Sequence, residues 1–542
     1  MSGPKDIGAV SAGAMGVSLM IGSGIFSTPA SILRLVGSPG MPLVLWSLGC
    51  VISLGGASAF IELGLMYRQN GGTMRFLAHA FPRPPRVALV PVRLVHVRAI
   101  AANGPVVGKY WLYAAGAKDE SGWRARAMGL LCISAATALN MGSAKWALRL
   151  ISLPTALKIA VLMCIVGGGV AAAAGSVRGV VGGGGGQGAW RAAFAGTSGD
   201  VHAYSGALAK VFWAHDGFAN PVYSLGELRR PERSLPWAIG GSVTLVGILY
   251  VLANLSFFIV VPMDVAVGSG EILAAEFTSR VFGPLVGRTV LPAAIGLSVL
   301  GAICSQTYGV ARPLDSVAQV GFVPGARRWM LCGNHRRLGT PVNALAATYA
   351  LTLVYLLAPP PGQVFDLLVD FVQWSTWLFY GPAALGAVGL RFTAPRHPGR
   401  SFRSVHLFNA LFMLFCLYIT VFPFVPPSKA EARQPYAFYL SPLLGLLTTA
   451  AGLIPWYFRM VWWPRRAGVD LLAWVGQAGQ EARQQEDEER VEEKPSRDSQ
   501  PSRDSQPSRD SLPPPLPETQ PPLLPQLLPS PQLHQGLTLP GY

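Results

Sequence analysis

The chain has 542 residues, of which 51% are apolar and only 13% charged, and its mean hydropathy is +0.38. A soluble domain carries about a quarter charged residues, so this composition excludes an ordinary soluble protein and favours a polytopic membrane protein. The net charge of +16 does not indicate nucleic-acid binding, because the basic residues are divided among alternate loops.

Apolar runs of about 20 residues recur along most of the chain, and each can cross a ~30 Å hydrocarbon core as a helix. Their boundaries predict about twelve transmembrane helices: 8–36, 41–66, 88–115, 127–144, 151–174, 203–228, 237–262, 286–316, 342–359, 364–391, 405–425 and 437–462. The first ten form two groups of five, 8–174 and 203–391, the number that a 5+5 inverted repeat needs. We therefore expect an all-α permease domain over residues 1–462, with helices 11 and 12 after the repeats.

Basic residues gather in every second loop between these helices. They are Arg68, Arg75, Arg83, Arg86, Lys145, Arg149, Arg229, Arg230, Arg233, Arg327, Arg328, Arg336, Arg337, Arg391, Arg396, Arg400 and Arg403. This alternation follows the positive-inside rule and places both termini in the cytoplasm, most simply at the plasma membrane. We expect no cleavable signal peptide. The six cysteines lie mostly within predicted helices, which argues against a disulfide framework.

Two of the predicted helices are interrupted at corresponding places in the two repeats. The first, Gly8 to Gly37, is broken at Gly22-Ser23-Gly24, and the second, Ala203 to Glu227, is broken around Ala214-His215-Asp216-Gly217. In a bilayer, non-helical backbone is tolerated only where it lines a cavity or is buried in protein. Interrupted segments at matching positions of two halves mark a transporter's binding site, so we predict discontinuous helices 1 and 6 around a substrate.

The first break presents backbone groups that suit a carboxylate. The amide groups of Ser23, Gly24 and Ile25 begin a half-helix, lack intrahelical partners and carry the positive end of its dipole. The last carbonyl groups before the two breaks, near Ile21 and over 212–214 (Phe212, Trp213, Ala214), can accept hydrogen bonds from an ammonium group. A zwitterion would then bind without any charged side chain.

Glycines allow the unusual dihedrals and the close backbone approach that such a site needs, and Gly22 and Gly217 stand at the two breaks. The alternative interpretation is a set of packing glycines of the small-xxx-small kind.

With these motifs the chain resembles the amino acid–polyamine–organocation superfamily over about residues 8–462. Ile21 to Phe26 with Pro29 resembles its first helix, Phe60 to Gly64 the end of its second, and Trp213 to Phe218 with Glu227, Pro231 and Leu235-Pro236 its sixth helix and following loop. Gly108 to Tyr110, Leu112 to Gly116 and Phe424 to Pro427 resemble the fungal L-type amino acid and methionine permeases. The resemblance implies a secondary active transporter that moves neutral L-amino acids by alternating access.

The resemblance also suggests roles around the second break. Trp213 takes the position of an aromatic gate that closes over bound substrate; the alternative is a packing or interfacial tryptophan. His215 and Asp216 stand where relatives have small or hydroxyl residues. Ionisable groups within a membrane are functional candidates by default. Either residue could titrate during transport, shift the substrate preference, or face a water-filled vestibule.

Lys158, by resemblance, lies where sodium-coupled relatives place their cation, close to the first break. Its ammonium would replace that ion, and as a buried lysine it could also carry a proton. The alternative is a lysine whose ammonium snorkels to the interface. We assign Glu62 and Glu227 as gate or packing partners of cytoplasmic arginines rather than as substrate ligands.

The third predicted helix is irregular, because Pro91, Arg93, His96 and Arg98 interrupt it. Each mid-span arginine costs ~2.5–3.5 kcal/mol on insertion scales. A degenerate, non-functional permease is therefore one alternative to a transporter, and an amino acid-sensing receptor without net transport is another.

No nucleophile–base constellation, metal-ligand spacing or phosphate-binding loop is evident in the sequence. We therefore expect neither an enzyme nor a metal or cofactor site. The loop from Gly116 to Arg124 has no cysteine. By resemblance, a cysteine there would join the chain to a heavy-chain partner, so we expect no disulfide-linked heavy chain.

The composition changes at about Val461. Glu481 to Lys494 is a charged run, and three copies of Pro-Ser-Arg-Asp-Ser follow from Pro495, Pro501 and Pro507, before Pro/Leu/Gln-rich sequence to the end. Such a segment cannot bury a core. We expect residues 463–542 to be a disordered cytoplasmic tail.

Overall fold

In the computed structural model the described residues are 8–68, 72–81, 95–117, 122–177, 192–223, 225, 228–319, 335, 338, 340–360, 364–427, 437–462 and 466. The chain divides into two compact units, Met1–Val475 and Gly476–Tyr542, and the fold below is that of the first. The described residues form helices and turns and contain no β-strand. The expected disordered tail lies outside them, apart from Arg466.

Every apolar run predicted to cross the membrane contains a helix of the structure. The first half comprises α1 (Ala9–Met20), α2 (Gly24–Ser27), α3 (Pro29–Val36), α4 (Gly40–Met66), α5 (Thr73–Ala80), α6 (Val95–Ala114), α7 (Trp123–Gly142) and α8 (Ala144–Ala173). The second half comprises α10 (Val201–His215), α11 (Asn220–Tyr223), α12 (Pro231–Val260), α13 (Met263–Gly268), η4 (Gly270–Ile272), α14 (Leu273–Phe282), η5 (Gly283–Val290), α15 (Leu291–Gln319), α16 (Val342–Leu357) and α17 (Val364–Thr393). The chain then forms α18 (His406–Val421), η6 (Phe422–Phe424), α19 (Leu440–Tyr457) and η7 (Phe458–Trp462).

Six helical stretches of the described chain are long and apolar enough to cross a membrane: Ala9–Ser27, Gly40–Met66, Thr155–Ala173, Pro231–Val260, Gly270–Gly309 and His406–Phe424. The surface of α18 shows which medium surrounds them. Leu407, Leu411, Leu414 and Leu417 recur on one face of this helix and are 41–65% exposed. A stripe of exposed leucines is stable against lipid rather than water, so the protein is an integral membrane protein.

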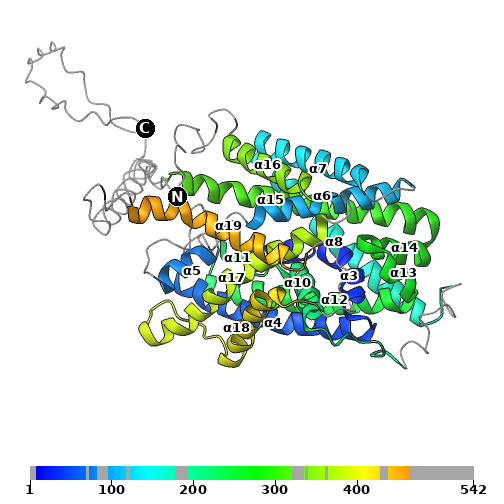
Figure 1. Ribbon diagram of the computed structural model, residues 1–542, viewed down its shortest axis with the longest axis horizontal. Coiled ribbons are helices and arrows are strands. Elements are labelled where there is room, and N and C mark those ends of the chain that lie inside the picture. Colours follow the sequence, from blue (N-terminus) through cyan, green and yellow to red (C-terminus); the bar gives the residue numbers. More distant parts are fainter. Residues whose placement is uncertain are drawn as a thin grey trace, which may run out of the picture. The chain divides into compact units, whose positions relative to one another are not determined.

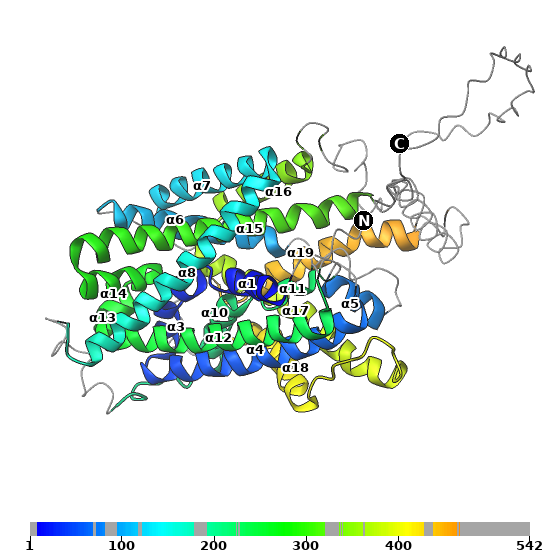
Figure 2. The ribbon, with the colours of Figure 1, turned by 180° about the vertical axis from the view of Figure 1, so that it is seen from behind.

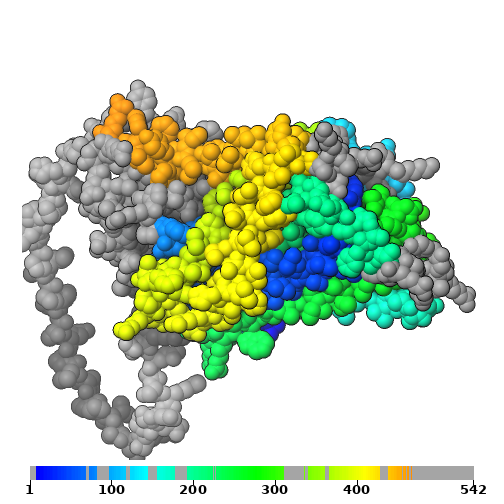
Figure 3. Space-filling view, turned by 60° about the horizontal axis from the view of Figure 1, so that its bottom comes forward, coloured from blue at the N-terminus to red at the C-terminus, as the bar shows by residue number. Residues whose placement is uncertain are grey.

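The broken helices lie in the interior of the bundle. In Figures 1 and 2, α7 and α16 lie along one edge and α4 and α18 along the opposite edge, with α1 and α10 between them. Helix α12 packs against both α1 and α4, while α6 packs against α7, α15 and α17. Figure 3 shows the segment that contains α18 (yellow) on the surface beside the N-terminal part of the chain (blue). The interrupted backbone is therefore surrounded by protein rather than by lipid.

Local sequence signals explain where the half-helices begin and end. Pro29 takes the first position of α3, where its missing N–H would have no intrahelical acceptor. Gly37 ends the same helix with φ +76°, a left-handed conformation that favours glycine. The carboxylate of Asp200 caps α10 by accepting a hydrogen bond from the His202 amide at 2.9 Å.

The irregular third helix is continuous where the structure describes it. Helix α6 is described from Val95 onward, and the part of the expected helix that contains Pro91 and Arg93 lies outside the described residues. Arg98 is 1% exposed, donates to the Ser375 and Thr448 hydroxyls at 3.1 and 3.4 Å, and lies over the ring of Phe371. The insertion cost of an arginine applies to a side chain that faces lipid. Arg98 instead faces the bundle, where hydroxyls and a ring contact its guanidinium.

Candidate functional site

The first break separates α1 from α2 at Ile21, Gly22 and Ser23, one residue earlier than the expected Gly22-Ser23-Gly24. The Gly22 amide turns back to the Met20 carbonyl at 2.7 Å instead of donating to Ser18 four residues earlier. The chain then restarts as α2, which leads through Thr28 directly into α3. The helix is therefore unwound for about one turn in the interior of the bundle.

The second break begins later than the sequence suggests. Helix α10 continues to His215, because the Asp216 amide still donates to the Phe212 carbonyl at 2.8 Å. Gly217 then adopts φ +130°, a conformation that L-residues rarely reach, and the helix stops. Ala214 and His215 therefore lie in the last turn of a half-helix rather than in the unwound segment, and Trp213 lies in the same turn.

The two breaks lie in direct contact. A Cβ added to Gly24 would lie 2.5 Å from the Ala214 Cα, and one added to Gly217 would lie 3.0 Å from the Met20 amide nitrogen. The Tyr250 hydroxyl of α12 also joins them, since it lies 2.6 Å from the Met20 carbonyl and 3.1 Å from the Ala214 carbonyl. It has one proton, so it donates to one of these carbonyls at a time. The sequence did not indicate Tyr250, which lies in a continuous apolar helix.

Several backbone groups at the breaks have no hydrogen-bond partner among the described residues. The amide groups are those of Ser23, Gly24 and Ile25, and the carbonyl groups include those of Ile21 and Trp213. The carbonyls of Phe212 and Ala214, by contrast, have partners within the protein. Buried backbone groups are nearly always paired, so this cluster of free donors and acceptors has the composition of a binding site for a small polar molecule.

A chain of polar side chains crosses the first break. The Trp213 indole donates to the Ser23 hydroxyl at 3.2 Å, and this hydroxyl donates to Asn103 Oδ1 of α6 at 2.5 Å. Asn103 in turn donates through Nδ2 to Gln306 Oε1 of α15 at 3.1 Å. These hydrogen bonds therefore link the first break to three helices, α6, α10 and α15. Sequence reasoning missed Asn103 and Gln306, although an asparagine inside an otherwise apolar run is a signal that could have found the former.

Lys158 lies beside the first break, on α8. Its side chain is 1% exposed, and the ammonium donates to the Ser18 carbonyl at 2.8 Å. This is the carbonyl that the Gly22 amide leaves without its helical donor. An ammonium buried in this way does not reach the membrane interface, so the geometry favours a cation that caps the broken helix over a snorkelling lysine.

His215 and Asp216 have different surroundings. His215 is fully buried, bonds to the Val211 carbonyl through Nδ1 at 2.9 Å, and packs its ring against Trp46 and Tyr250. It does not face a vestibule. Asp216 accepts a hydrogen bond from the Tyr380 hydroxyl of α17 at 3.3 Å, which joins the second break to that helix.

Glu62 contacts arginines, as expected, and lies at the end of α4 away from the two breaks. It forms ion pairs with Arg391 at 2.5 Å and Arg400 at 3.3 Å, and it accepts hydrogen bonds from the amide and hydroxyl of Ser404. Its side chain is completely buried. Glu227 lies outside the described residues.

A second ionic cluster, which the sequence did not indicate, joins the half-helices to α17. Lys210 lies one turn before Ala214 on α10 and forms ion pairs with Asp370 at 3.0 Å and Asp366 at 3.5 Å. Arg34, at the end of α3, also pairs with Asp366 at 3.4 Å. An acidic pair four residues apart in an apolar helix is the signal that could have found this cluster.

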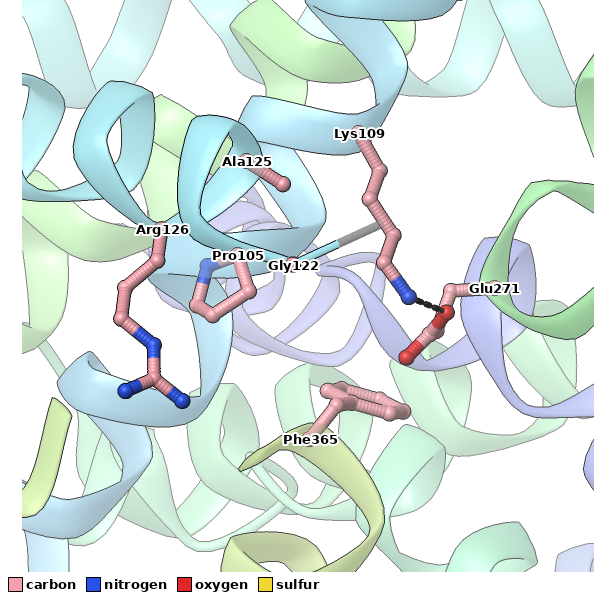
Figure 4. Close-up of a pocket in the computed structure, with 7 residues that line it drawn as sticks. All are labelled: Pro105, Lys109, Gly122, Ala125, Arg126, Glu271 and Phe365. Atoms are coloured by element: carbon pink, nitrogen blue, oxygen red, sulfur yellow. Dashed lines mark hydrogen bonds and ion pairs between the residues drawn. The ribbon is translucent and has the colours of Figure 1, made fainter. Parts of the chain in front are cut away.

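A small pocket lies close to the same end of α17. Figure 4 shows Lys109 of α6 and Glu271 of η4 pointing toward one another as an ion pair, with the ring of Phe365 beside them and Arg126 directed away. Phe365 packs edge-on against Trp213, with ring centroids 6.3 Å apart. The pocket is therefore separated from the first break by two aromatic side chains. Within the described ranges, no three His, Cys, Asp or Glu side chains are grouped so that they could hold a metal ion.

Comparison with known proteins agrees with this geometry. The profile of the amino acid permease family matches residues 7–448. The high-affinity methionine permease of Saccharomyces cerevisiae is 26% identical over 438 residues, which cover 79% of this chain and 74% of that protein. The human cystine/glutamate transporter is 27% identical over 450 residues, which cover 82% of this chain and 83% of that transporter.

A third relative, the large neutral amino acids transporter small subunit 2 of Rattus norvegicus, is 27% identical over 477 residues, which cover 85% of this chain and 82% of the relative. These relatives are transporters rather than enzymes. The matched region contains both helix breaks and the helices that surround them. The chain belongs to the amino acid permease family.

Proposed function

We propose that this protein is a secondary active transporter that moves large neutral L-amino acids, methionine among them, by alternating access. The observation that carries the proposal is the contact between two helix breaks whose amide and carbonyl groups lack partners. The substrate carboxylate would bind the amides of Ser23, Gly24 and Ile25, and its ammonium would bind the backbone carbonyls of Ile21 and Trp213, which have no partner among the described residues. Names of relatives that refer to methionine and to large neutral amino acids support this substrate class.

The proposal includes the membrane arrangement. Twelve spans in a 5+5 inverted repeat plus two would place both termini in the cytoplasm of a plasma-membrane protein. The alternating distribution of arginine supports this orientation. In it, the Glu62–Arg391–Arg400 cluster closes the cytoplasmic side, and the Lys210–Asp366–Asp370 cluster closes the outer side. The protein would work without a disulfide-linked partner.

Uptake of radiolabelled methionine in a host that lacks its own permeases tests this function. We expect saturable uptake that other large neutral amino acids inhibit and that acidic and basic amino acids do not. Specific binding to the purified protein without any flux in proteoliposomes would identify a receptor instead. A folded protein that neither binds nor transports would identify a degenerate permease.

Trp213 provides a test of the gate. Replacing Trp213 with alanine removes both the indole donor to Ser23 and the ring that packs on Phe365. We expect substrate affinity to fall by no more than about tenfold, the effect of one neutral hydrogen bond, and flux in proteoliposomes to fall much further, because closure commits the substrate to transport.

Trp213→Phe separates the two contributions, since it keeps a ring and loses only the indole N–H. Trp237, which is 78% exposed on α12, supplies the matched control, and Trp237→Ala should leave both measurements unchanged. Equal losses of affinity and flux in Trp213→Ala would make this residue a wall of the pocket rather than a gate.

A further inference from the structure

The Ser23–Asn103 hydrogen bond lies at the first break, where the proposed function places the substrate carboxylate. Ser23 Oγ is 2.5 Å from Asn103 Oδ1, and both side chains are almost completely buried, at 2% and 1% exposure. Ser23 belongs to the break whose amide groups are free, whereas Asn103 belongs to α6 (Val95–Ala114) and contacts that break through this bond. The two side chains use each other as donor and acceptor.

A hydrogen bond to Gln306 fixes the orientation of the Asn103 side-chain amide. Its Nδ2 donates to Gln306 Oε1 at 3.1 Å, so its Oδ1 must be directed at Ser23. An amide held in this way presents a fixed acceptor toward the break. Three candidate carbonyl acceptors there, those of Met20, Phe212 and Ala214, already receive hydrogen bonds from the protein. Asn103 Oδ1 is a side-chain acceptor that contacts the first break directly, through the Ser23 hydroxyl.

We propose that Asn103 is a substrate-positioning residue that accepts a hydrogen bond from the substrate ammonium in exchange for the Ser23 hydroxyl. This inference rests on the proposed amino acid site. A zwitterion that reaches the break offers a carboxylate to the Ser23 hydroxyl and an ammonium to Asn103 Oδ1. One neutral hydrogen bond within the protein is exchanged for two charge-assisted ones, which are roughly twice as strong. The two side chains separate to admit the substrate.

The exchange explains a selectivity that backbone groups alone do not provide. A carboxylic acid without an ammonium can still take the Ser23 hydroxyl, but it leaves Asn103 Oδ1 buried without a donor. Leaving a buried acceptor unpaired costs affinity, and sites built to bind a donor reject analogues that lack it. Asn103 would therefore make the site select α-amino acids over the corresponding carboxylic acids that have no donor on the α-carbon.

The test compares two ligands on four purified proteins. The ligands are L-methionine and its analogue without the amino group, which has no donor on the α-carbon, and the readout is the ratio of their equilibrium affinities. In Asn103→Leu, which has a similar volume and no acceptor, we expect methionine affinity to fall by about ten- to a hundredfold and the affinity for the analogue without the amino group to change far less. In Asn103→Asp, which keeps the acceptor and adds a negative charge, we expect the ratio to rise in favour of methionine.

Asn140→Leu is the matched control. Asn140 is a buried asparagine of α7 whose amide donates within its own helix to the Ala136 carbonyl at 2.8 Å, so its replacement should leave the ratio unchanged. A merely structural role for Asn103 would lower both affinities together. An unchanged ratio in Asn103→Asp, or in a folded Asn103→Leu, would overturn the inference while leaving the transporter in place. Absence of methionine binding by the wild-type protein would instead overturn the proposed function.

Discussion

Replacing Gly24 with valine should abolish amino acid binding. The first carbon of the new side chain would lie 2.5 Å from Ala214 Cα and 2.6 Å from its Cβ. Because the nearest atom belongs to the backbone of α10, no rotamer change relieves the clash, and the two breaks must move apart. We expect affinity to fall by at least about a hundredfold, since overpacking of this severity exceeds the usual range of a few kcal/mol. Equilibrium binding of radiolabelled methionine to purified protein measures the effect.

Gly240→Val provides the control for this substitution. Gly240 also lies within a helix, α12, and a Cβ at that position would meet no atom within 4 Å. Size-exclusion profiles of both variants show whether the bundle folds. Methionine binding at wild-type affinity in Gly24→Val would show that the contact between the two breaks is not part of the binding site.

The broken helices could be predicted because their interruptions are local. Gly22-Ser23-Gly24 inside an apolar run indicates either a helix-packing surface or unwound backbone. Because a second interruption occurs at the corresponding place in the second half, unwound backbone is the favoured interpretation. The exact end of α10 could not be predicted. The hydrogen bond from the Asp216 amide to the Phe212 carbonyl keeps Ala214 and His215 helical, two residues into the expected break. Residue composition does not predict such a bond.

The partners of the breaks depend on which helices are neighbours, and hydropathy does not contain that information. Asn103, Tyr250 and Gln306 come from three helices far apart in the sequence, yet all three contact the breaks or the chain of side chains that crosses the first break. For the same reason the insertion scales misjudged Arg98. They assign an energy to an arginine surrounded by lipid, whereas the bundle places it against Ser375 and Phe371.

Lys158 is the site residue for which sequence and structure together give the sharpest expectation. The resemblance placed a cation near the first break, and the structure places the ammonium on the Ser18 carbonyl, which the break itself has freed. A sodium ion would need several oxygen ligands at this point, whereas the Lys158 ammonium is a positive charge attached covalently to α8. A fixed cation removes the need for a dissolved one.

We therefore expect uptake in proteoliposomes to be the same in sodium and in choline buffers, and Lys158→Met to lose at least about tenfold of its flux. The methionine keeps the bulk of the lysine but leaves the Ser18 carbonyl buried without a donor, which costs about 1–3 kcal/mol. Leu157→Met introduces the same side chain one residue away and should retain flux. Stimulation of the wild type by sodium would contradict the fixed-cation role. A pH dependence of flux that is present in the wild type and absent from Lys158→Met would show instead that the lysine carries a proton during transport.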